Sequence, residues 1–196
     1  MKKKFRVTLV LTLVLLTLGI QVLPASAFVT WGANYKLING IHNQYSWYDS
    51  TTIDSTVHSY ITSARNDWNN TPTHVWFIEV ADKSSSVMDI YRGNYFPASY
   101  GYAAMTHFFV GNPPEIDPTL QNYGWTRIEL NAVTFDTLST SGLNLKRAVI
   151  AHEMGHALGL AHNSSNVNVL MYPYINSWTV NGPTQDEING MNFLYP

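Results

Sequence analysis

Three histidines and one glutamate lie close together in the second half of the chain, at a spacing that suits metal chemistry. The segment contains His152, Glu153, His156 and His162, with Gly159 before the last histidine. Residues four apart on an α-helix share one face, so His152 and His156 can point at one ion. Gly159 lets the chain leave the helix through a backbone conformation that other residues resist, and His162 can then turn back as a third ligand. The spacing therefore predicts a metal centre held by three imidazoles.

The predicted centre has three protein ligands, which is typical of catalytic rather than structural zinc because the fourth position stays open. Zinc lowers the pKa of its bound water to about 7 and polarises a carbonyl. Glu153 directly follows the first ligand, so it is the candidate general base for hydrolysis. The alternative is an amphipathic helix with hydrogen-bonded core histidines. That alternative leaves the three histidines and the glycine at the turn unexplained.

Hydrophobic periodicity and capping residues predict the elements that must position these side chains. Residues 145–158 form the predicted helix of the motif, and Gly159 is placed to end it. Two further helices are predicted at 54–69 and at 184–194, the second with a capping box at its start. Strands are predicted at 35–38, 75–80, 87–91, 103–110 and 126–130. This order of strands and helices predicts an α+β domain.

The first 27 residues have the layout of a secretory signal peptide. A positive head at residues 2–6 precedes an apolar run from Val7 to Ile20, and Ala25-Ser26-Ala27 offers a cleavage site. We therefore predict a signal peptide at 1–27, a catalytic domain at 28–196 and a secreted, extracellular protein without stable membrane association after cleavage. An uncleaved membrane anchor is the alternative, because the apolar run is long for a signal peptide.

Composition excludes several classes of protein. The 196 residues are 45% hydrophobic, which suits one folded domain and excludes a disordered chain. Four of the 11 basic residues lie in the first 27 positions, whereas all 13 acidic residues lie beyond them. The remaining chain is acidic, so nucleic-acid binding is not expected. There is no cysteine, so disulfides do not stabilise this protein. The expected partner is a protein or peptide substrate, and the expected state is a monomer.

The segment from Ala151 to His162 resembles the extended zinc motif of the metzincin peptidases. Metzincins also place a methionine in a tight turn beneath the zinc, and Met171 within residues 169–173 is similar to it. The resemblance is greatest to the matrixins and their bacterial relatives. In these proteins Tyr-Pro likewise follows the methionine, and the domain closes with a helix like residues 186–190.

The resemblance implies a metzincin-like (zincin) α+β fold, with a mixed five-stranded sheet and two long helices. A small C-terminal subdomain would carry Met171 in the Met-turn. The resemblance also implies that residues 103–109 form an edge strand along which an extended peptide lies antiparallel. Residues 173–175 would line the pocket for the side chain after the cut.

Two departures from the matrixin pattern affect the expected cofactors and regulation. Matrixins carry a propeptide whose cysteine blocks the zinc, so a chain without cysteine cannot be latent by that route. Matrixins also hold a structural zinc partly through a His-x-Asp sequence, which is absent here, and only His107 lies in the corresponding region. We therefore expect one catalytic zinc and no second zinc. Calcium bound by loop oxygens is only weakly supported, because acidic residues are sparse.

Three functions remain open from the sequence. The leading hypothesis is a secreted zinc metalloendopeptidase that hydrolyses peptide bonds through a zinc-bound water activated by Glu153. A zinc hydrolase acting on cell-wall peptide would use the same residues. A non-catalytic relative that serves as a zinc-containing binding module would have no chemical need for Glu153. An activity panel and the Glu153→Gln variant distinguish the three.

Overall fold

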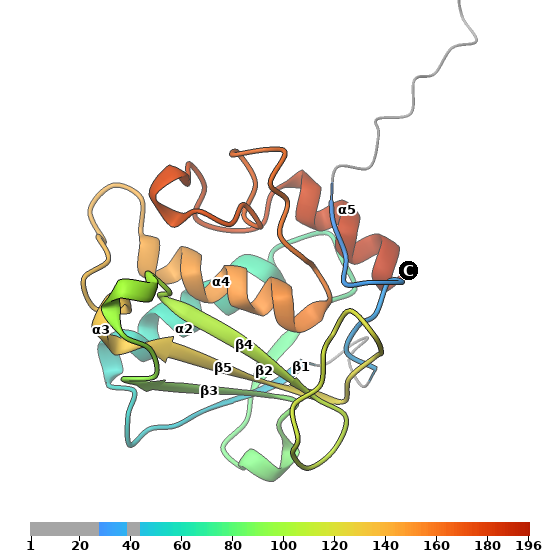
Figure 1. Cartoon of the computed structure of the whole chain (residues 1–196), viewed down its shortest axis with the longest axis horizontal. Coiled ribbons are helices and arrows are strands. Elements are labelled where there is room, and N and C mark those ends of the chain that lie inside the picture. The colour runs from blue at the N-terminus through green and yellow to red at the C-terminus, as the bar shows by residue number, and fades with distance from the viewer. Residues whose placement is uncertain (1–27, 39–43) are drawn as a thin grey trace, which may run out of the picture.

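A computed structural model describes residues 28–38 and 44–196, and the predicted signal peptide lies outside the described residues. A five-stranded sheet carries the long helices on one face (Figure 1). Its strands are β1 (Gln44–Tyr48), β2 (Phe77–Glu79), β3 (Met88–Gly93), β4 (Ala104–Phe109) and β5 (Trp125–Asn131). Their order is β2-β1-β3-β5-β4, and all neighbours are parallel except β4, which runs antiparallel to β5 at the edge. The predicted mixed five-stranded sheet is confirmed.

The three predicted helices are present, and a further short helix at 132–135 was not predicted. The helices are α2 (Ser55–Asn69), α3 (Ala132–Phe135), α4 (Leu145–Leu158) and α5 (Gln185–Leu194), with three short 3₁₀ helices at 83–85, 98–100 and 175–177. The Asp54 carboxylate caps α2 by accepting from two backbone amides of its first turn. Thr184 and Glu187 form the predicted capping box of α5. Among the described residues, no helix is long and apolar enough to cross a membrane.

Helix α4 lies in the middle of the molecule, between the sheet, α2 and the C-terminal loops (Figure 1). Every residue from 148 to 158 is buried, so this part of the helix packs against protein over most of its surface. The sheet contributes fully buried side chains such as Ile90 and Ile128. From α2, the Trp68 indole donates to the Ala151 carbonyl at 3.0 Å. The helix that carries the motif is therefore fixed by packing as well as by its own hydrogen bonds.

The C-terminal end of α4 is held by three aromatic side chains. The Tyr195 hydroxyl donates to the Leu158 carbonyl at 2.7 Å. The Trp31 indole and the Tyr123 hydroxyl donate to the carbonyl of His156 at 3.1 and 3.2 Å. The Tyr195 bond satisfies a carbonyl of the last helical turn, and the His156 carbonyl accepts the two other bonds in addition to one from the Gly159 amide. These bonds also fix the turn from which the second histidine of the motif projects.

Two strand predictions need correction. Residues 35–38 form no strand, because Tyr35 and Leu37 make only isolated bridges, to Trp31 and Tyr123. The strand β1 was not predicted, because its pattern of polarity is inverted. Ser46 is buried, whereas the neighbouring Tyr45 is 38% exposed. The strand predicted at 75–80 is shorter, because only residues 77–79 pair with β1.

Candidate metal centre and active site

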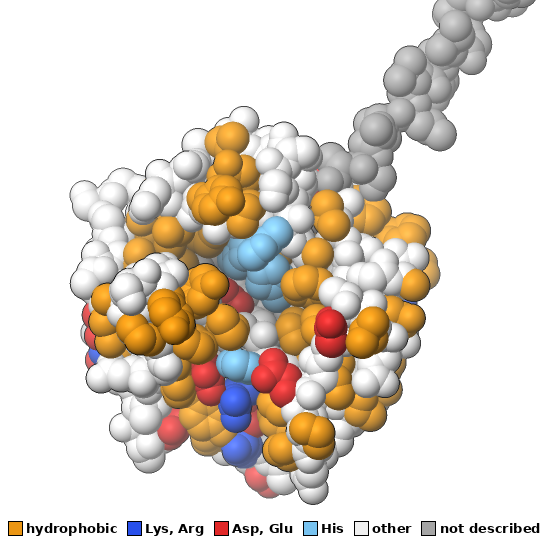
Figure 2. Space-filling view, in the orientation of Figure 1, with side chains coloured by type: hydrophobic (Ala, Val, Ile, Leu, Met, Phe, Trp, Pro, Cys, Tyr) orange, Lys and Arg blue, Asp and Glu red, His pale blue; other side chains and the backbone are white. Residues whose placement is uncertain are grey.

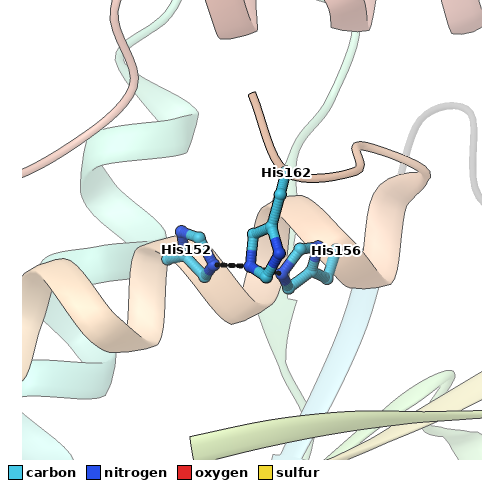
Figure 3. Close-up of side chains that lie close together, drawn as sticks. All are labelled: His152, His156 and His162. Atoms are coloured by element: carbon cyan, nitrogen blue, oxygen red, sulfur yellow. Dashed lines mark hydrogen bonds between the residues drawn. The ribbon is translucent and has the colours of Figure 1, made fainter. Parts of the chain in front are cut away.

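The three histidines of the motif converge on one point (Figure 3). The Nε2 atoms of His152 and His156 each lie 3.2 Å from the Nε2 atom of His162. His152 and His156 project from successive turns of α4, and His162 comes from the loop beyond it. The loop turns back at Gly159, whose φ of 121° lies in a region that side chains disfavour. The geometry predicted from the spacing is therefore present.

The second nitrogen of each helical histidine is fixed by a backbone carbonyl. His152 Nδ1 lies 2.7 Å from the Leu170 oxygen, and His156 Nδ1 lies 2.8 Å from the Leu160 oxygen. A carbonyl only accepts, so each Nδ1 carries the proton and each Nε2 presents a lone pair to the cluster. Burial lowers the pKa of His152 to about 3 and lowers the pKa of His156 well below its usual value. The pKa of His162 is also lowered by desolvation.

These donors fit zinc. Neutral imidazole is a preferred zinc ligand, and Zn–N bonds of about 2.0–2.1 Å at tetrahedral angles place the nitrogens roughly 3.3 Å apart. The 3.2 Å separations from His162 agree with that requirement. Carbonyl oxygens on the outer nitrogens of His152 and His156 orient the rings, as is usual around protein zinc. No other group of three metal-binding side chains occurs among residues 28–38 and 44–196.

Met171 lies in a turn packed beneath the histidines. Its side chain is buried, and a Cβ atom at Gly155 would lie only 2.6 Å from its sulfur. Glycine between the two helical histidines therefore lets the turn approach α4 closely. The buried carboxylate of Glu187 accepts from the Met171 amide at 3.0 Å and from the Thr184 amide at 2.8 Å. One side chain thus ties the Met-turn to the start of α5.

Glu153 is the acid–base group nearest the histidines in sequence, and its side chain is almost fully buried. Burial raises the pKa of its carboxyl to about 7, although a hydrogen bond from Thr106 acts in the opposite direction. The Thr106 hydroxyl lies 2.6 Å from Glu153 Oε2. A carboxyl with a pKa near neutrality can take up and release a proton at physiological pH.

A cavity of about 360 Å³ opens beside the histidines and runs along β4. Figure 2 shows the histidine side chains at the centre of this hollow, flanked by hydrophobic side chains. Its walls include Val149, Pro173, Ile175 and Trp178, so the surface beside the centre is largely apolar. The size and lining are typical of a ligand-binding site.

The side chains that line the cavity include some that the sequence predicted and others that it did not. Pro173 and Ile175 line the cavity as predicted, but Tyr174 does not line it and is 65% exposed. Trp31 and Trp178 line the cavity and contact the rings of the helical histidines, yet no local motif distinguishes them. Thr106 was also missed. Its one sequence signal is a polar residue at an inward position of β4.

His107 lies outside the metal cluster. Its Nδ1 is 3.0 Å from the carboxylate oxygens of Glu115, and its Nε2 is 3.2 Å from Glu129 Oε2. These two acids raise the pKa of His107, with Glu129 contributing most. His107 therefore makes hydrogen bonds to two acids and contributes no nitrogen to the metal cluster.

Known proteins resemble this chain in sequence and in fold. The family described as Matrixin matches residues 31–196. Stromelysin-1 of Equus caballus is 45% identical over 64 residues, which make up 30% of this chain and 13% of that protein. Matrix metalloproteinase-20 of Homo sapiens is 47% identical over 62 residues, or 30% of this chain and 12% of that protein.

A solved structure described as the GM1-bound form of the ECX AB5 holotoxin contains a chain with a similar fold. The TM-score is 0.58 at 18% identity, over 87% of this chain and 89% of that one. The likeness shows a shared fold. The family match extends over most of the chain and includes all three histidines, Glu153 and the Met-turn. The chain belongs to the matrixin family.

Proposed function

We propose that this protein is a secreted zinc metalloendopeptidase that hydrolyses peptide bonds, with Glu153 as general base. Matrixins are zinc metallopeptidases, and this chain matches the family from residue 31 to residue 196. The observation that carries the proposal is the convergence of the three Nε2 atoms of His152, His156 and His162 beside Glu153. The curated relatives are matched over only 13% and 12% of their own lengths, so their substrates are not transferred to this chain.

The three histidines would hold one zinc ion, which when bound supplies a Lewis acid for the scissile carbonyl and acidifies a water. Glu153 would take a proton from the attacking water and deliver it to the leaving amine. Its raised pKa supports both steps, because a carboxyl with a pKa near 7 exchanges protons readily at neutral pH. The apolar cavity walls would exclude competing water from the reacting groups.

The substrate would be an extended peptide or protein segment. Strand β4 pairs with β5 on one side only, and its other side borders the cavity. A peptide can add to such an edge through backbone hydrogen bonds. The apolar wall formed by Val149, Pro173 and Ile175 favours an apolar side chain next to the cleaved bond.

The proposal includes the cellular context that the sequence predicts. Residues 1–27 would direct secretion, and residues 28–196 would act outside the cell as a monomer without stable membrane association. Matrixins are generally extracellular, which supports this location. The acidic charge of the chain beyond residue 27 argues against nucleic acid as a partner. A calcium requirement has weaker support than the zinc site, because acidic residues are sparse in the sequence.

Casein hydrolysis by the purified protein tests the proposal, together with zinc analysis of the same sample. We expect one zinc per chain, activity that a chelator abolishes and that added zinc restores. The Glu153→Gln variant should retain zinc and fold but lose about 10²–10⁴-fold in kcat. Glu115→Gln is the matched control, because the same chemical change at this exposed acid should leave hydrolysis near the wild-type rate.

Two results would redirect the assignment. Hydrolysis of peptidoglycan peptide but not of casein would indicate a cell-wall hydrolase. One zinc per chain without hydrolysis of either substrate would indicate a binding module. Wild-type activity in the Glu153→Gln variant would exclude the proposed general base.

A further inference from the structure

Thr106 contacts Glu153 from the edge strand of the sheet. Its hydroxyl lies 2.6 Å from Glu153 Oε2 and 3.2 Å from the Glu153 backbone oxygen. Both side chains are buried, with 8% and 6% of their surfaces exposed. The two residues are 47 positions apart in the sequence, so the fold alone brings them together.

The hydroxyl proton goes to the carboxylate. A threonine hydroxyl has one proton to donate, and the shorter contact is with Oε2. A hydrogen bond to a carboxylate is stronger than one to a neutral carbonyl. Among the residues that the structure describes, Thr106 is the one side chain that donates to the Glu153 carboxylate. This bond occupies Oε2 and leaves Oε1 without a side-chain donor.

The position of the hydroxyl is set by rigid elements. Strand β4 pairs with β5 along its whole length, and Thr106 lies opposite Ile128. Helix α4, which carries Glu153, packs directly on both strands. Threonine is β-branched, so its side chain has few rotamers. The glutamate side chain, in contrast, has three rotatable bonds that its own helix does not fix.

We propose that Thr106 is a positioning residue for the hydrolytic reaction, which rests on the proposed function of Glu153. Its hydroxyl holds Oε2 and so fixes the carboxylate in one rotamer, with Oε1 left for proton exchange with the attacking water and the leaving amine. Fixing a reacting group in the productive geometry lowers the entropic part of the barrier. Thr106 does not touch the substrate's reacting atoms, so its effect passes through Glu153.

A purely structural role is the competing explanation. Buried carboxylates need hydrogen-bond partners, and Thr106 would then only satisfy Glu153 in the folded state. In that case, removing the hydroxyl lowers stability, but each folded molecule turns over as before. A positioning role instead lowers kcat in molecules that are folded and loaded with zinc.

The test compares Thr106→Val with Thr106→Ser in the full secreted protein, using steady-state cleavage of a fluorogenic peptide. Valine keeps the shape and removes the hydroxyl, whereas serine keeps the hydroxyl. We expect the valine variant to lose roughly 10-fold or more in kcat, with KM and zinc content near wild type. The serine variant should stay within about threefold of wild type.

Thr126→Val is the matched control, because Thr126 is a buried threonine on the adjacent strand β5 that bonds a backbone carbonyl. Its kcat should be unchanged. A double-mutant cycle adds Glu153→Asp, whose shorter side chain already withdraws the carboxylate from Thr106. The kcat of the double variant should then fall by less than the product of the fold-losses of the two single variants. If the valine variant does not fold, Thr106→Ala replaces it in the same comparison.

Wild-type kcat in the hydroxyl-free variant would overturn the inference and leave the proposed function intact. Equal losses in the serine and valine variants would also overturn it, because the methyl group would then be responsible. If the wild-type protein with one zinc per chain cleaved no peptide, the proposed function and this inference would both be wrong.

Discussion

Histidine serves opposite purposes in two regions of this molecule. In the three-histidine cluster, burial lowers the pKa values of His152 and His156 far below the usual value. On the strand β4, His107 lies between Glu129 and Glu115, and these acids raise its pKa. Both regions border the strand β4, so location alone does not explain the difference. Burial without a carboxylate partner favours the neutral forms of His152 and His156, whereas two carboxylates favour the protonated form of His107.

The hydrogen-bond partners of each ring determine whether a histidine can offer a lone pair to a metal or carries a proton on both nitrogens. The outer nitrogens of His152 and His156 face backbone carbonyls, which leaves a free lone pair on each inner nitrogen. His107 faces a carboxylate at each nitrogen, so its protonated form donates twice and has no lone pair for a metal. The cluster offers the neutral imidazole nitrogens that zinc prefers, whereas the hydrogen bonds of His107 tie Glu115 and its loop to the sheet.

Replacing one histidine in each region tests whether the two regions act independently, and it should have the largest effect. We expect His156→Ala to abolish zinc binding and to lower peptide hydrolysis by about 10³-fold or more, because two ligands do not define the site. His107→Ala should retain one zinc per chain and most of the activity. Zinc content and kcat, measured on folded samples, give the answer. Loss of zinc from the His107→Ala variant would show that the two regions are not independent.

Zinc removal should have the next largest effect, on stability. A ligand that binds only the folded protein adds about 4 kcal/mol at 1,000 times its Kd. For a domain of this size, that corresponds to a fall in Tm of roughly 10 °C when a chelator removes the metal. His156→Ala should show almost no chelator effect, because it has no zinc to lose. Thermal unfolding with and without chelator checks this, and equal shifts in both proteins would contradict it.

Acid should destabilise the metal-free protein through the same cluster. The folded pKa values of His152 and His156 are lowered, so below about pH 6.5 the unfolded chain binds protons that the folded chain does not. The contribution of these two histidines to the free energy of unfolding is therefore complete above pH 6.5 and is lost as the pH falls. Each buried ring can contribute up to about 1.4 kcal/mol per pH unit. Urea unfolding between pH 7.5 and pH 5 measures the slope.

The double variant His152→Gln and His156→Gln provides the control for that slope. Glutamine is polar but does not titrate, so the metal-free variant should lose less stability than the wild type between pH 6.5 and pH 5. An equally steep fall in the stability of this variant with decreasing pH would show that other groups cause the acid sensitivity.

The sequence predicted the parts of the site that depend on local geometry. His152 and His156 could be placed together because four residues make about one helical turn, and Gly159 indicated the reversal that returns His162. Helices α2, α4 and α5 followed from caps and periodicity for the same reason. Each of these features is encoded within a few neighbouring residues.

Contacts between distant segments could not be predicted in the same way. Thr106 meets Glu153 only because β4 and α4 pack together, and nothing in the periodicity of either segment pairs the two. Trp31 reaches the His156 carbonyl from the start of the described chain. The strand β1 was missed because a serine occupies its buried position, whereas Tyr45 and Trp47 lie on the opposite, more exposed face. Tertiary packing overrides the local pattern at these positions.

The smallest expected effect is the loss of stability on replacing His107. Its raised folded pKa means that its contribution is complete below about pH 6.5 and is lost as the pH rises through the folded pKa. We therefore expect His107→Gln to be less stable than wild type by about 1–2 kcal/mol at pH 6, and by less at pH 9. Urea unfolding at the two pH values measures the difference.

This pH dependence has the opposite sign to that of the metal cluster, which makes it a direct test of the comparison. Glu115→Gln is a useful control, because it removes the more exposed partner and leaves Glu129 in place. Its loss at pH 6 should be smaller than that of His107→Gln, since Glu129 contributes most to the raised pKa. If the His107→Gln variant lost more stability relative to wild type at pH 9 than at pH 6, the result would contradict a protonated His107. The bonds to Glu115 and Glu129 would then be those of a neutral ring, and the contrast between the two regions would fail.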